Sequence, residues 1–199
     1  MLIAGVAVAG ALALDPWAHA ALARPGVYDR DWGRLLRVMG YVPTWLLAAT
    51  ALWLHDRRTG AGGRRAAVLA LAPVIGGAIA EVLKLLFRRE RPGDVLGPYL
   101  FRDFADRPWS TSGLGLPSSH ALVAFGAAVA LGRLFPAARW VWYALAAGCA
   151  WSRVAAHAHW LSDVVAAAAV AVGVATLVWR TPCHDVAGPT TISAVRAPE

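Results

Sequence analysis

The sequence is poor in charged residues, and this shortage limits the class of protein that it can encode. Only 16% of its 199 residues are charged, while 58% are hydrophobic. Soluble domains average roughly 25% charged residues. The length suits one domain and is short for two. The composition therefore indicates a single domain whose main solvent is lipid rather than water.

Cysteine is almost absent, which argues against a disulfide-stabilised protein and against a cysteine-based zinc site. The only two cysteines are Cys149 and Cys183. Two distant cysteines do not form a disulfide framework, and no Cys/His spacing resembles a zinc site. We expect both thiols to be inert.

Lysine is nearly absent as well, although the chain is basic. Lys84 is the one lysine beside eighteen arginines, and the net charge is +7. Basic chains can bind nucleic acid, but here the arginines lie between apolar stretches and no nucleic-acid module is recognisable. Anionic lipid headgroups or phosphate are better partners, so we expect a membrane and a phosphorylated lipid rather than nucleic acid.

Long apolar runs dominate what the sequence does contain. A spanning helix needs about 20 residues, and runs of this order predict an all-α, integral membrane bundle of six transmembrane helices within residues 1–180. Residues 181–199 are predicted to form a disordered cytoplasmic tail. The predicted spans are residues 2–22, 40–55, 66–87, 120–135, 138–154 and 160–179.

Two segments near the N-terminus are ambiguous. Asp15-Pro16 interrupts the first run, and residues 18–20 resemble a signal-peptidase site. A signal peptide should begin with positive charge, but no lysine or arginine precedes Arg24. We therefore favour a retained helix, while a cleaved signal stays open. Residues 27–39 can form an amphipathic helix lying in the membrane surface, or a polar loop.

Arginines in the loops predict the orientation. They occur in residues 56–65, in residues 133–139 and at Arg180. Since all three places fall on one side of the predicted bundle, that side is expected to face the cytoplasm. Three polar clusters then lie together at the extracytoplasmic face.

The first polar cluster ends the third apolar run. Lys84 and Arg91 are seven residues apart, so on a helix they would share a face until Pro92 stops it. Arg89 is typical of a basic cap whose charge reaches out to the interface. Glu81, one turn before Lys84, could neutralise it or face another helix.

The second cluster is residues 117–120, Pro-Ser-Ser-His, at the start of the fourth run. Serine before an apolar helix is an N-cap signal, and a helix N-terminus binds anions. Ordinary capping explains the pattern equally well. Residues 93–116, rich in Gly, Pro and Asp, are predicted to form a loop that acts as a lid or a substrate entrance.

The third cluster brackets the loop before the sixth run. His159 and Asp163 are four residues apart, so the carboxylate can accept a hydrogen bond from one ring nitrogen and leave the other free to attack. Ser152-Arg153 precedes them. His157 is six residues from Asp163, outside this geometry, and is interpreted as a loop histidine.

Taken in order, these clusters resemble the three-part signature of the type 2 phosphatidic acid phosphatase superfamily. The signature is Lys, six residues, Arg-Pro, then Pro-Ser-x-His, then Ser-Arg, five residues, His, three residues, Asp. It spans residues 84–163. One departure is Ser119, where the family usually has glycine, and we expect it to modify affinity rather than abolish activity. The resemblance implies a six-helix bundle that needs no metal or other cofactor.

The resemblance also assigns roles by position. It implies that His159 is the nucleophile and forms a phosphohistidine, with Asp163 orienting it. His120 would protonate the leaving oxygen and then activate water. The phosphate would be bound by Lys84, Arg91, Ser118, Ser119 and Arg153.

These expectations describe a lipid phosphatase of the cell membrane, acting on a phosphomonoester or pyrophosphate at the outer face. Undecaprenyl pyrophosphate, phosphatidylglycerol phosphate, phosphatidic acid and lipid A phosphates are all compatible substrates. The composition, rich in alanine, arginine and glycine, suggests a bacterium. Two alternatives stay open: an oxidase resembling vanadium haloperoxidases, and a six-span lipid carrier or channel that is not an enzyme.

Overall fold

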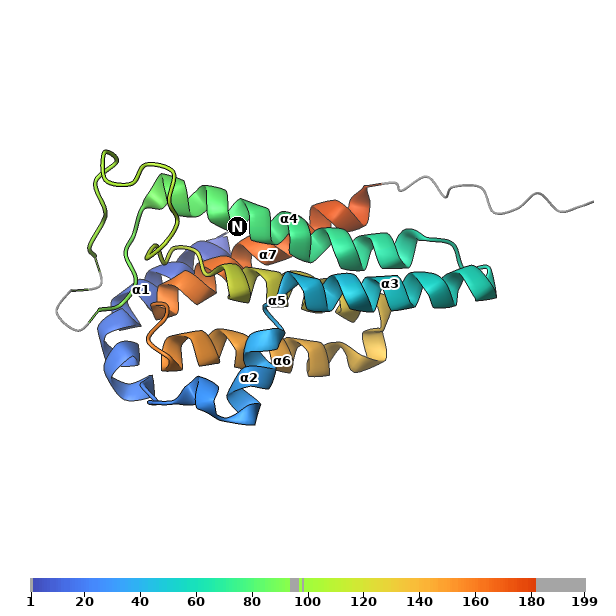
Figure 1. Cartoon of the computed structure of the whole chain (residues 1–199), viewed down its shortest axis with the longest axis horizontal. Helices are drawn as coiled ribbons and strands as arrows, with labels where there is room; N and C mark the ends of the chain where they lie inside the picture. Colours follow the sequence, from blue (N-terminus) through green and yellow to red (C-terminus); the bar gives the residue numbers. More distant parts are fainter. Residues whose placement is uncertain (1, 94–96, 98, 182–199) are drawn as a thin grey trace, which may run out of the picture.

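The computed structural model describes residues 2–93, 97 and 99–181, and the regular structure in them is helical (Figure 1). Two isolated β-bridges, Arg89–Phe101 and Glu90–Leu114, are the exceptions in these residues. The all-α prediction is confirmed. The predicted tail and Cys183 lie outside the described residues. The helices are α1 (Leu2–Leu22), η1 (Val27–Asp29), α2 (Asp31–Val38), α3 (Val42–Thr59), α4 (Arg64–Phe87), α5 (Ser119–Leu134), η2 (Pro136–Ala138), α6 (Arg139–Ala155) and α7 (Leu161–Arg180).

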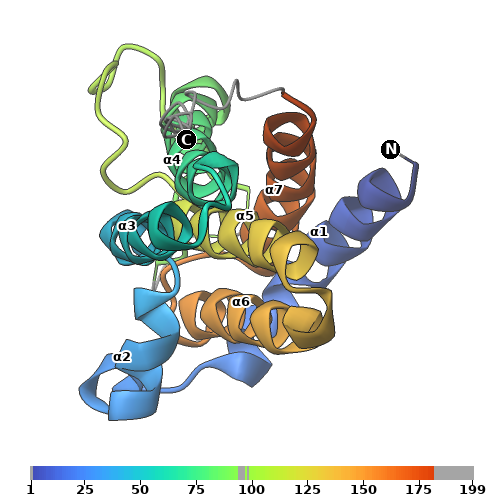
Figure 2. The ribbon, with the colours of Figure 1, turned by 90° about the vertical axis from the view of Figure 1, so that its right-hand side faces the viewer.

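Helix α5 is the centre of the bundle, packed by α4, α6 and α7 (Figure 2). Most of its residues are buried, and many are alanine or glycine. Small residues let helix backbones approach closely. A Cβ built on Gly126 would lie only 3.2 Å from the carbonyl oxygen of Ala72 in α4. The fourth apolar run is therefore apolar all round because other helices surround it.

Each of the six predicted spans coincides with a long helix, but fewer of them qualify as membrane spans. By length and hydropathy, α1, α4 and α7 can cross a bilayer. A fourth is added if α2 and α3, bent by 67° at their junction, are taken together. Helix α5 is apolar but has only 16 residues. The apolar helices indicate a membrane protein. Three or four of them meet this criterion, so the six predicted spans are not confirmed.

The amphipathic segment at residues 27–39 is helical rather than a polar loop. It forms η1 and α2, and α2 packs on α6. Leu36 of α2 lies against Gly148, where an added Cβ would come within 2.7 Å of its Cδ2. Trp32 stacks on Trp151 with ring centroids 5.5 Å apart.

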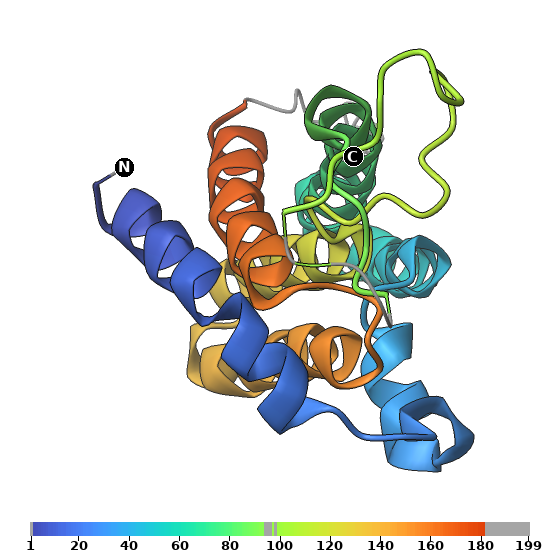
Figure 3. The same cartoon turned by 90° about the vertical axis from the view of Figure 1, so that its left-hand side faces the viewer.

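Helix α1 runs through Pro16 without a break, so Asp15-Pro16 does not interrupt it as the sequence suggested. Asp15 and Ala18 are fully buried. Helix α1 lies along α7 (Figure 3). The burial of a carboxylate explains why this weakest apolar run still forms one helix: the charge faces protein, where polar partners replace water.

The chain brings the three polar clusters to one end of the bundle. Helix α4 ends there, α5 begins there, and the α6–α7 connection turns there (Figure 1). The α3–α4 turn lies at the opposite end. Antiparallel packing of successive helices thus places side chains from residues 84 to 163 side by side.

Candidate active site

Helix α4 ends earlier than its sequence suggested. Arg88 takes a left-handed backbone conformation, with φ 54°, and its N–H donates to the carbonyl of Lys84 at 2.8 Å. Arg91 is therefore not on a helical face with Lys84, and that part of the prediction was wrong. The Nε of Arg91 instead donates to the carbonyl of Leu114 at 3.2 Å.

Arg88 holds the connection between α4 and α5. Its buried guanidinium donates to four carbonyls of the loop, those of Arg102 at 3.2 Å, Asp103 at 2.8 Å, Asp106 at 2.5 Å and Pro108 at 3.4 Å. The described part of the loop is thereby tied to the end of α4. Whether it acts as a lid or an entrance stays a prediction.

Lys84 is buried and paired within the site. Its ammonium donates to Oε1 of Glu81 at 2.7 Å and also contacts the hydroxyl of Ser119. The Ser119 hydroxyl in turn donates to Glu81 Oε1 at 2.5 Å. The prediction that Glu81 could neutralise Lys84 is confirmed. Ser119 joins this pair, a contact that a glycine could not make.

The start of α5 presents two predicted residues in different ways. Ser118 is the N-cap: its Oγ accepts from the N–H of Ala121 at 3.4 Å, while its own N–H donates to the carbonyl of Asp163 at 3.1 Å. Ser119 and His120 stand in the first turn, where N–H groups have no partner within the helix. Gly40 packs on His120, since an added Cβ would lie 2.6 Å from the histidine Cβ.

His159 is oriented by two acceptors at the start of α7. Its Nδ1 lies 2.9 Å from the carbonyl of Gly115 and 3.4 Å from Oδ2 of Asp163. The same Oδ2 accepts from the N–H of Trp160 at 3.0 Å. A proton on Nδ1 satisfies these acceptors and leaves Nε2 with its lone pair. The backbone carbonyl is thus the nearer partner, and sequence reasoning named only the carboxylate.

Gly115 is required at this place because the backbone passes the carboxylate so closely. A Cβ there would lie 2.6 Å from Oδ2 of Asp163. An alanine would push Asp163 or the Gly115 carbonyl away from His159. In the sequence, nothing distinguished Gly115 from the other glycines of residues 93–116.

The charges of three cations act on His159. Arg153, Arg91 and Lys84 all act electrostatically on its ring, and the ring is buried. Burial first, and then these positive charges, hold the pKa of His159 well below its usual range. The imidazole is therefore neutral at physiological pH, as a nucleophile requires.

Arg153 is held by one contact and keeps another donor open. Its Nη1 donates to the hydroxyl of Tyr28 at 2.9 Å. Its Nε is buried and has no hydrogen-bond partner among the described residues. An unpaired buried donor costs free energy, so an anion bound beside Arg153 would satisfy it. Tyr28 was not singled out in the sequence.

Arg89 does not reach outward as a basic cap, and that prediction was wrong. It is only 1% exposed. Its guanidinium pairs with Asp163 at 3.1 Å and with Asp15 of α1 at 2.7 Å. A carboxylate inside an apolar helix is costly without a partner, and this was the signal by which Asp15 could have been found.

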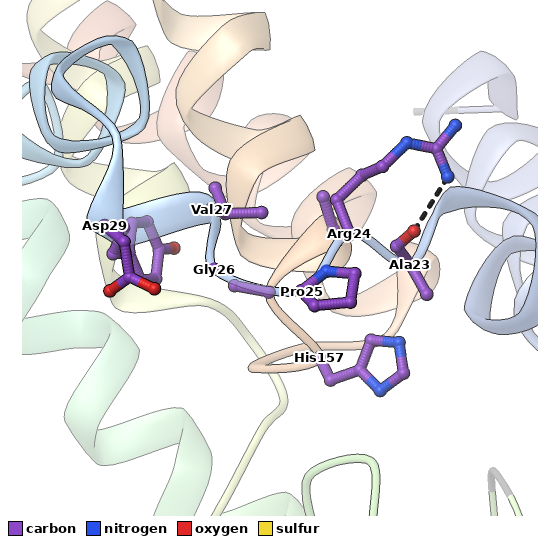
Figure 4. A pocket seen from close by; sticks show the side chains of 10 residues that line it. Ala23, Arg24, Pro25, Gly26, Val27, Asp29 and His157 are labelled. Atoms are coloured by element: carbon purple, nitrogen blue, oxygen red, sulfur yellow. Dashed lines mark hydrogen bonds between the residues drawn. The ribbon is translucent and has the colours of Figure 1, made fainter.

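His157 lies apart from these groups. It lines a cavity of about 510 Å³ formed with residues 23–29 and the end of α6, and no predicted catalytic residue lines it (Figure 4). The imidazole packs on His19, with ring centroids 4.2 Å apart. This position is that of a loop histidine.

The sequence match agrees with this geometry. The model of the PAP2 superfamily matches residues 65–184, more than half of the chain. The chain belongs to the PAP2 superfamily. No curated protein and no solved structure gives a significant match.

Membership supports a phosphatase in general terms, because members of the PAP2 superfamily are phosphatases. The match contains all three polar clusters, but it begins after α3. Asp15, Tyr28 and Gly40 are therefore contributed by a part of the chain that the PAP2 match does not cover. In the described residues, no three His, Cys, Asp or Glu side chains converge as metal ligands would.

Ser119→Gly, which restores the residue usual in the PAP2 signature, should change substrate affinity more than turnover. The hydroxyl of Ser119 helps to hold Lys84 against Glu81. Losing one such hydrogen bond, worth about 0.5–1.5 kcal/mol, should free the ammonium for phosphate. We expect KM for a lipid phosphate to fall by about two- to tenfold, with kcat changing by less.

Ser119→Ala separates the side chain from the backbone in this experiment. It removes the same hydroxyl without giving the helix start the freedom of glycine. Both variants should lower KM. A rise in KM for both would show that the Ser119 hydroxyl binds the substrate itself.

Proposed function

We propose that the chain is a membrane phosphatase that hydrolyses a lipid phosphomonoester or pyrophosphate through a phosphohistidine at His159. One observation carries the proposal: a neutral, buried imidazole is fixed through Nδ1 and lies among Lys84, Arg91 and Arg153. A nucleophile surrounded by cations suits attack on an anionic phosphorus centre. Resemblance to the PAP2 signature supports the same roles.

In the first step, Nε2 of His159 attacks phosphorus and the bond to the leaving oxygen breaks. His120 donates a proton to that oxygen, so the lipid alcohol or lipid phosphate leaves neutralised. In the second step, His120 takes a proton from water, and the resulting nucleophile attacks the phosphohistidine. Inorganic phosphate is released and the His159 imidazole is restored.

Positioned cations do most of the stabilising in phosphoryl transfer, because negative charge is spread over the oxygens of the transferred group. Lys84 and Arg153 are both buried. Lys84 comes from α4, in the first polar cluster, and Arg153 comes from α6, in the third. The unpaired Nε of Arg153 is a donor suited to one phosphate oxygen. At the start of α5, Ser119 would add its backbone N–H and Ser118 its hydroxyl, since the N–H of Ser118 is already used and the Ser119 hydroxyl pairs with Glu81.

A lipid substrate fits the position of the site at one end of apolar helices. A headgroup at the membrane surface can reach such a site while its chains stay in the bilayer. The distribution of loop arginines favours the outer face of the cell membrane. Which lipid is used depends on groups beyond the phosphate.

Phosphate release from the purified protein in detergent tests the proposal. The panel is undecaprenyl pyrophosphate, phosphatidylglycerol phosphate, phosphatidic acid and lipid A phosphates, with a soluble phosphomonoester alongside. We expect at least one lipid to be hydrolysed faster than the soluble ester. Folded protein that releases no phosphate from any of them would indicate a carrier, and halide oxidation with added vanadate would indicate an oxidase.

The pH dependence should be bell-shaped. His159 must be neutral to attack, and because its pKa lies well below the usual range, it should stay neutral as the pH falls below about 6.5. Activity should therefore be lost on the acid side only at lower pH. Burial and then the charge of Arg153 lower the pKa of the His120 imidazole to about 3 in the free protein, so His120 can hold the proton for the leaving group only beside a bound phosphate anion. The alkaline side of the kcat profile, which reports the enzyme–substrate complex, should therefore show loss of that proton. Measurement of kcat between about pH 4 and 9 checks this, and a flat profile would contradict a pair of catalytic histidines.

A further inference from the structure

We propose that Asp15 of α1 is a positioning residue of this active site, acting through Arg89 and Ser162 on Asp163. The inference rests on the proposed function and adds to it a residue outside the matched part of the chain. It explains why the first helix carries a charge in an apolar run. It also gives the first helix a part in the chemistry of His159.

Arg89 joins two carboxylates that come from opposite ends of the sequence. Its Nη2 lies 2.7 Å from Oδ2 of Asp15, and its Nη1 lies 3.1 Å from Oδ1 of Asp163. Both carboxylates are fully buried, and Arg89 is 1% exposed. Charged hydrogen bonds shielded from water are stronger than exposed ones. The guanidinium therefore fixes α1 relative to the residue that orients the nucleophile.

Asp15 also binds the first turn of α7 directly. Its Oδ1 accepts from the N–H of Ser162 at 2.8 Å, and its Oδ2 accepts from the Ser162 hydroxyl at 2.6 Å. A carboxylate at a helix N-terminus satisfies free N–H groups and interacts favourably with the helix dipole. In this protein the carboxylate comes from another helix. The turn that it holds is the one that presents Asp163.

The two oxygens of Asp163 have separate partners as a result. Arg89 takes Oδ1, while Oδ2 faces the ring of His159 at 3.4 Å. If Asp15 no longer shared the guanidinium, Arg89 could turn both of its terminal nitrogens onto Asp163. The carboxylate would then rotate away from His159 and lose part of its charge to the arginine.

Charge gives the direction of the expected effect. Asp15, Arg89 and Asp163 together carry one net negative charge beside His159. Attack on phosphorus makes the imidazole positive, so this negative charge stabilises the transition state. Removing the Asp15 charge leaves Arg89 and Asp163 neutral as a pair. Phosphorylation of His159 should slow. Substrate binding by Lys84, Arg91 and Arg153 should change little, because these cations pair with Glu81, the carbonyl of Leu114 and Tyr28 rather than with Asp15.

The experiment compares Asp15→Asn with Asp56→Asn in the full-length protein. Asp56 is a matched control: it is also fully buried in a helix and pairs with an arginine, Arg65 at 3.1 Å, at the opposite end of the bundle. The outer partners of metal-ligating histidines provide the nearest scale, since their loss typically costs about 10- to 100-fold in metal affinity or activity. We expect kcat to fall by about 10- to 100-fold for Asp15→Asn, with KM within about twofold. Asp56→Asn should keep the wild-type kcat.

Single-turnover measurement at saturating enzyme concentration separates positioning from loss of folded protein, because its rate constant does not depend on how many molecules are active. In Asp15→Asn this rate constant should fall by about 10- to 100-fold, as kcat does. An unchanged single-turnover rate constant, with the lower kcat arising from fewer active molecules, would overturn the proposal. If Asp15→Asn and Asp56→Asn lose the same activity, the proposal is also overturned.

The double variant Asp15→Asn with Arg89→Gln distinguishes an effect on the charge of Asp163 from a merely structural role of Asp15. It removes both members of the pair and leaves the Asp163 charge free to face His159. It should therefore phosphorylate several-fold faster than Asp15→Asn alone, a non-additive result expected of coupled residues. Additive losses would contradict the proposal. Absence of phosphohistidine and of phosphate release in the wild type would instead refute the proposed function, and this inference with it.

Discussion

His159→Ala should abolish phosphate release, whereas His157→Ala should keep most of it. In the proposed mechanism the first change removes the attacking nitrogen, and the cations that act on His159, which are Lys84, Arg91 and Arg153, are proposed to bind phosphate rather than attack it. Loss of a covalent nucleophile should lower kcat by roughly 10³-fold or more. Release of inorganic phosphate from the best lipid substrate measures the effect.

His157 is the natural control because it lies two residues away and carries the same ring. It lines the cavity beside residues 23–29 and packs on His19 (Figure 4). Its backbone is left-handed, with φ 53°, so His157→Asn is a useful second control, since asparagine tolerates this conformation. Both controls should retain most of the wild-type rate. Equal losses for His157→Ala and His159→Ala would mean that the wrong histidine has been assigned.

His120→Ala should cost about 10²- to 10⁴-fold with a lipid substrate, the range typical of general acid–base catalysis. The size of the loss should depend on the leaving group. A lipid alcohol needs a proton to leave, but p-nitrophenolate does not. With p-nitrophenyl phosphate the first step should therefore survive in His120→Ala, while hydrolysis of the intermediate, which needs a base to activate water, stays slow.

Phosphohistidine should accordingly accumulate in His120→Ala with the activated ester. A burst of p-nitrophenol equal to the enzyme concentration, followed by a slow phase, would reveal it. His55→Ala is the control, because His55 is exposed near the end of α3 on the opposite side of the bundle. A loss of the same size for both substrates, without a burst, would exclude His120 as the acid and base of this reaction.

The apolar runs allowed the helices to be predicted because burial in lipid or protein leaves an uninterrupted pattern in the sequence. Ends were harder. Phe87 closes α4 because Arg88 adopts a left-handed backbone, and no glycine or nearby proline marks that residue. The sequence therefore predicted a helix that continued to Arg91, with Arg91 and Lys84 on the same face. The pairing of Lys84 with Glu81, one turn apart within α4, was predictable because both lie inside regular helix.

Neighbouring arginines were the least predictable part of the site. Arg88, Arg89 and Arg91 are chemically identical, yet one binds loop carbonyls, one joins two carboxylates, and one lies among the cations around His159. The partners of each arginine depend on how the chain turns after α4. That turn is set by backbone contacts with the loop before α5, such as those of Glu90 with Leu100 and of Arg91 with Gly113. Helical periodicity carries no information about such contacts.

The contact between Asp15 and Ser162 bears on how the protein is made. These residues are 147 positions apart, so almost the whole polypeptide must leave the ribosome before they can meet. Until α7 inserts, the nascent first helix holds a carboxylate without its serine, at a cost inside a bilayer. Arrival of the last helix removes that cost and brings Asp163 and its partners together in the same event, so under the proposed function a chain that stops short in synthesis should be inactive.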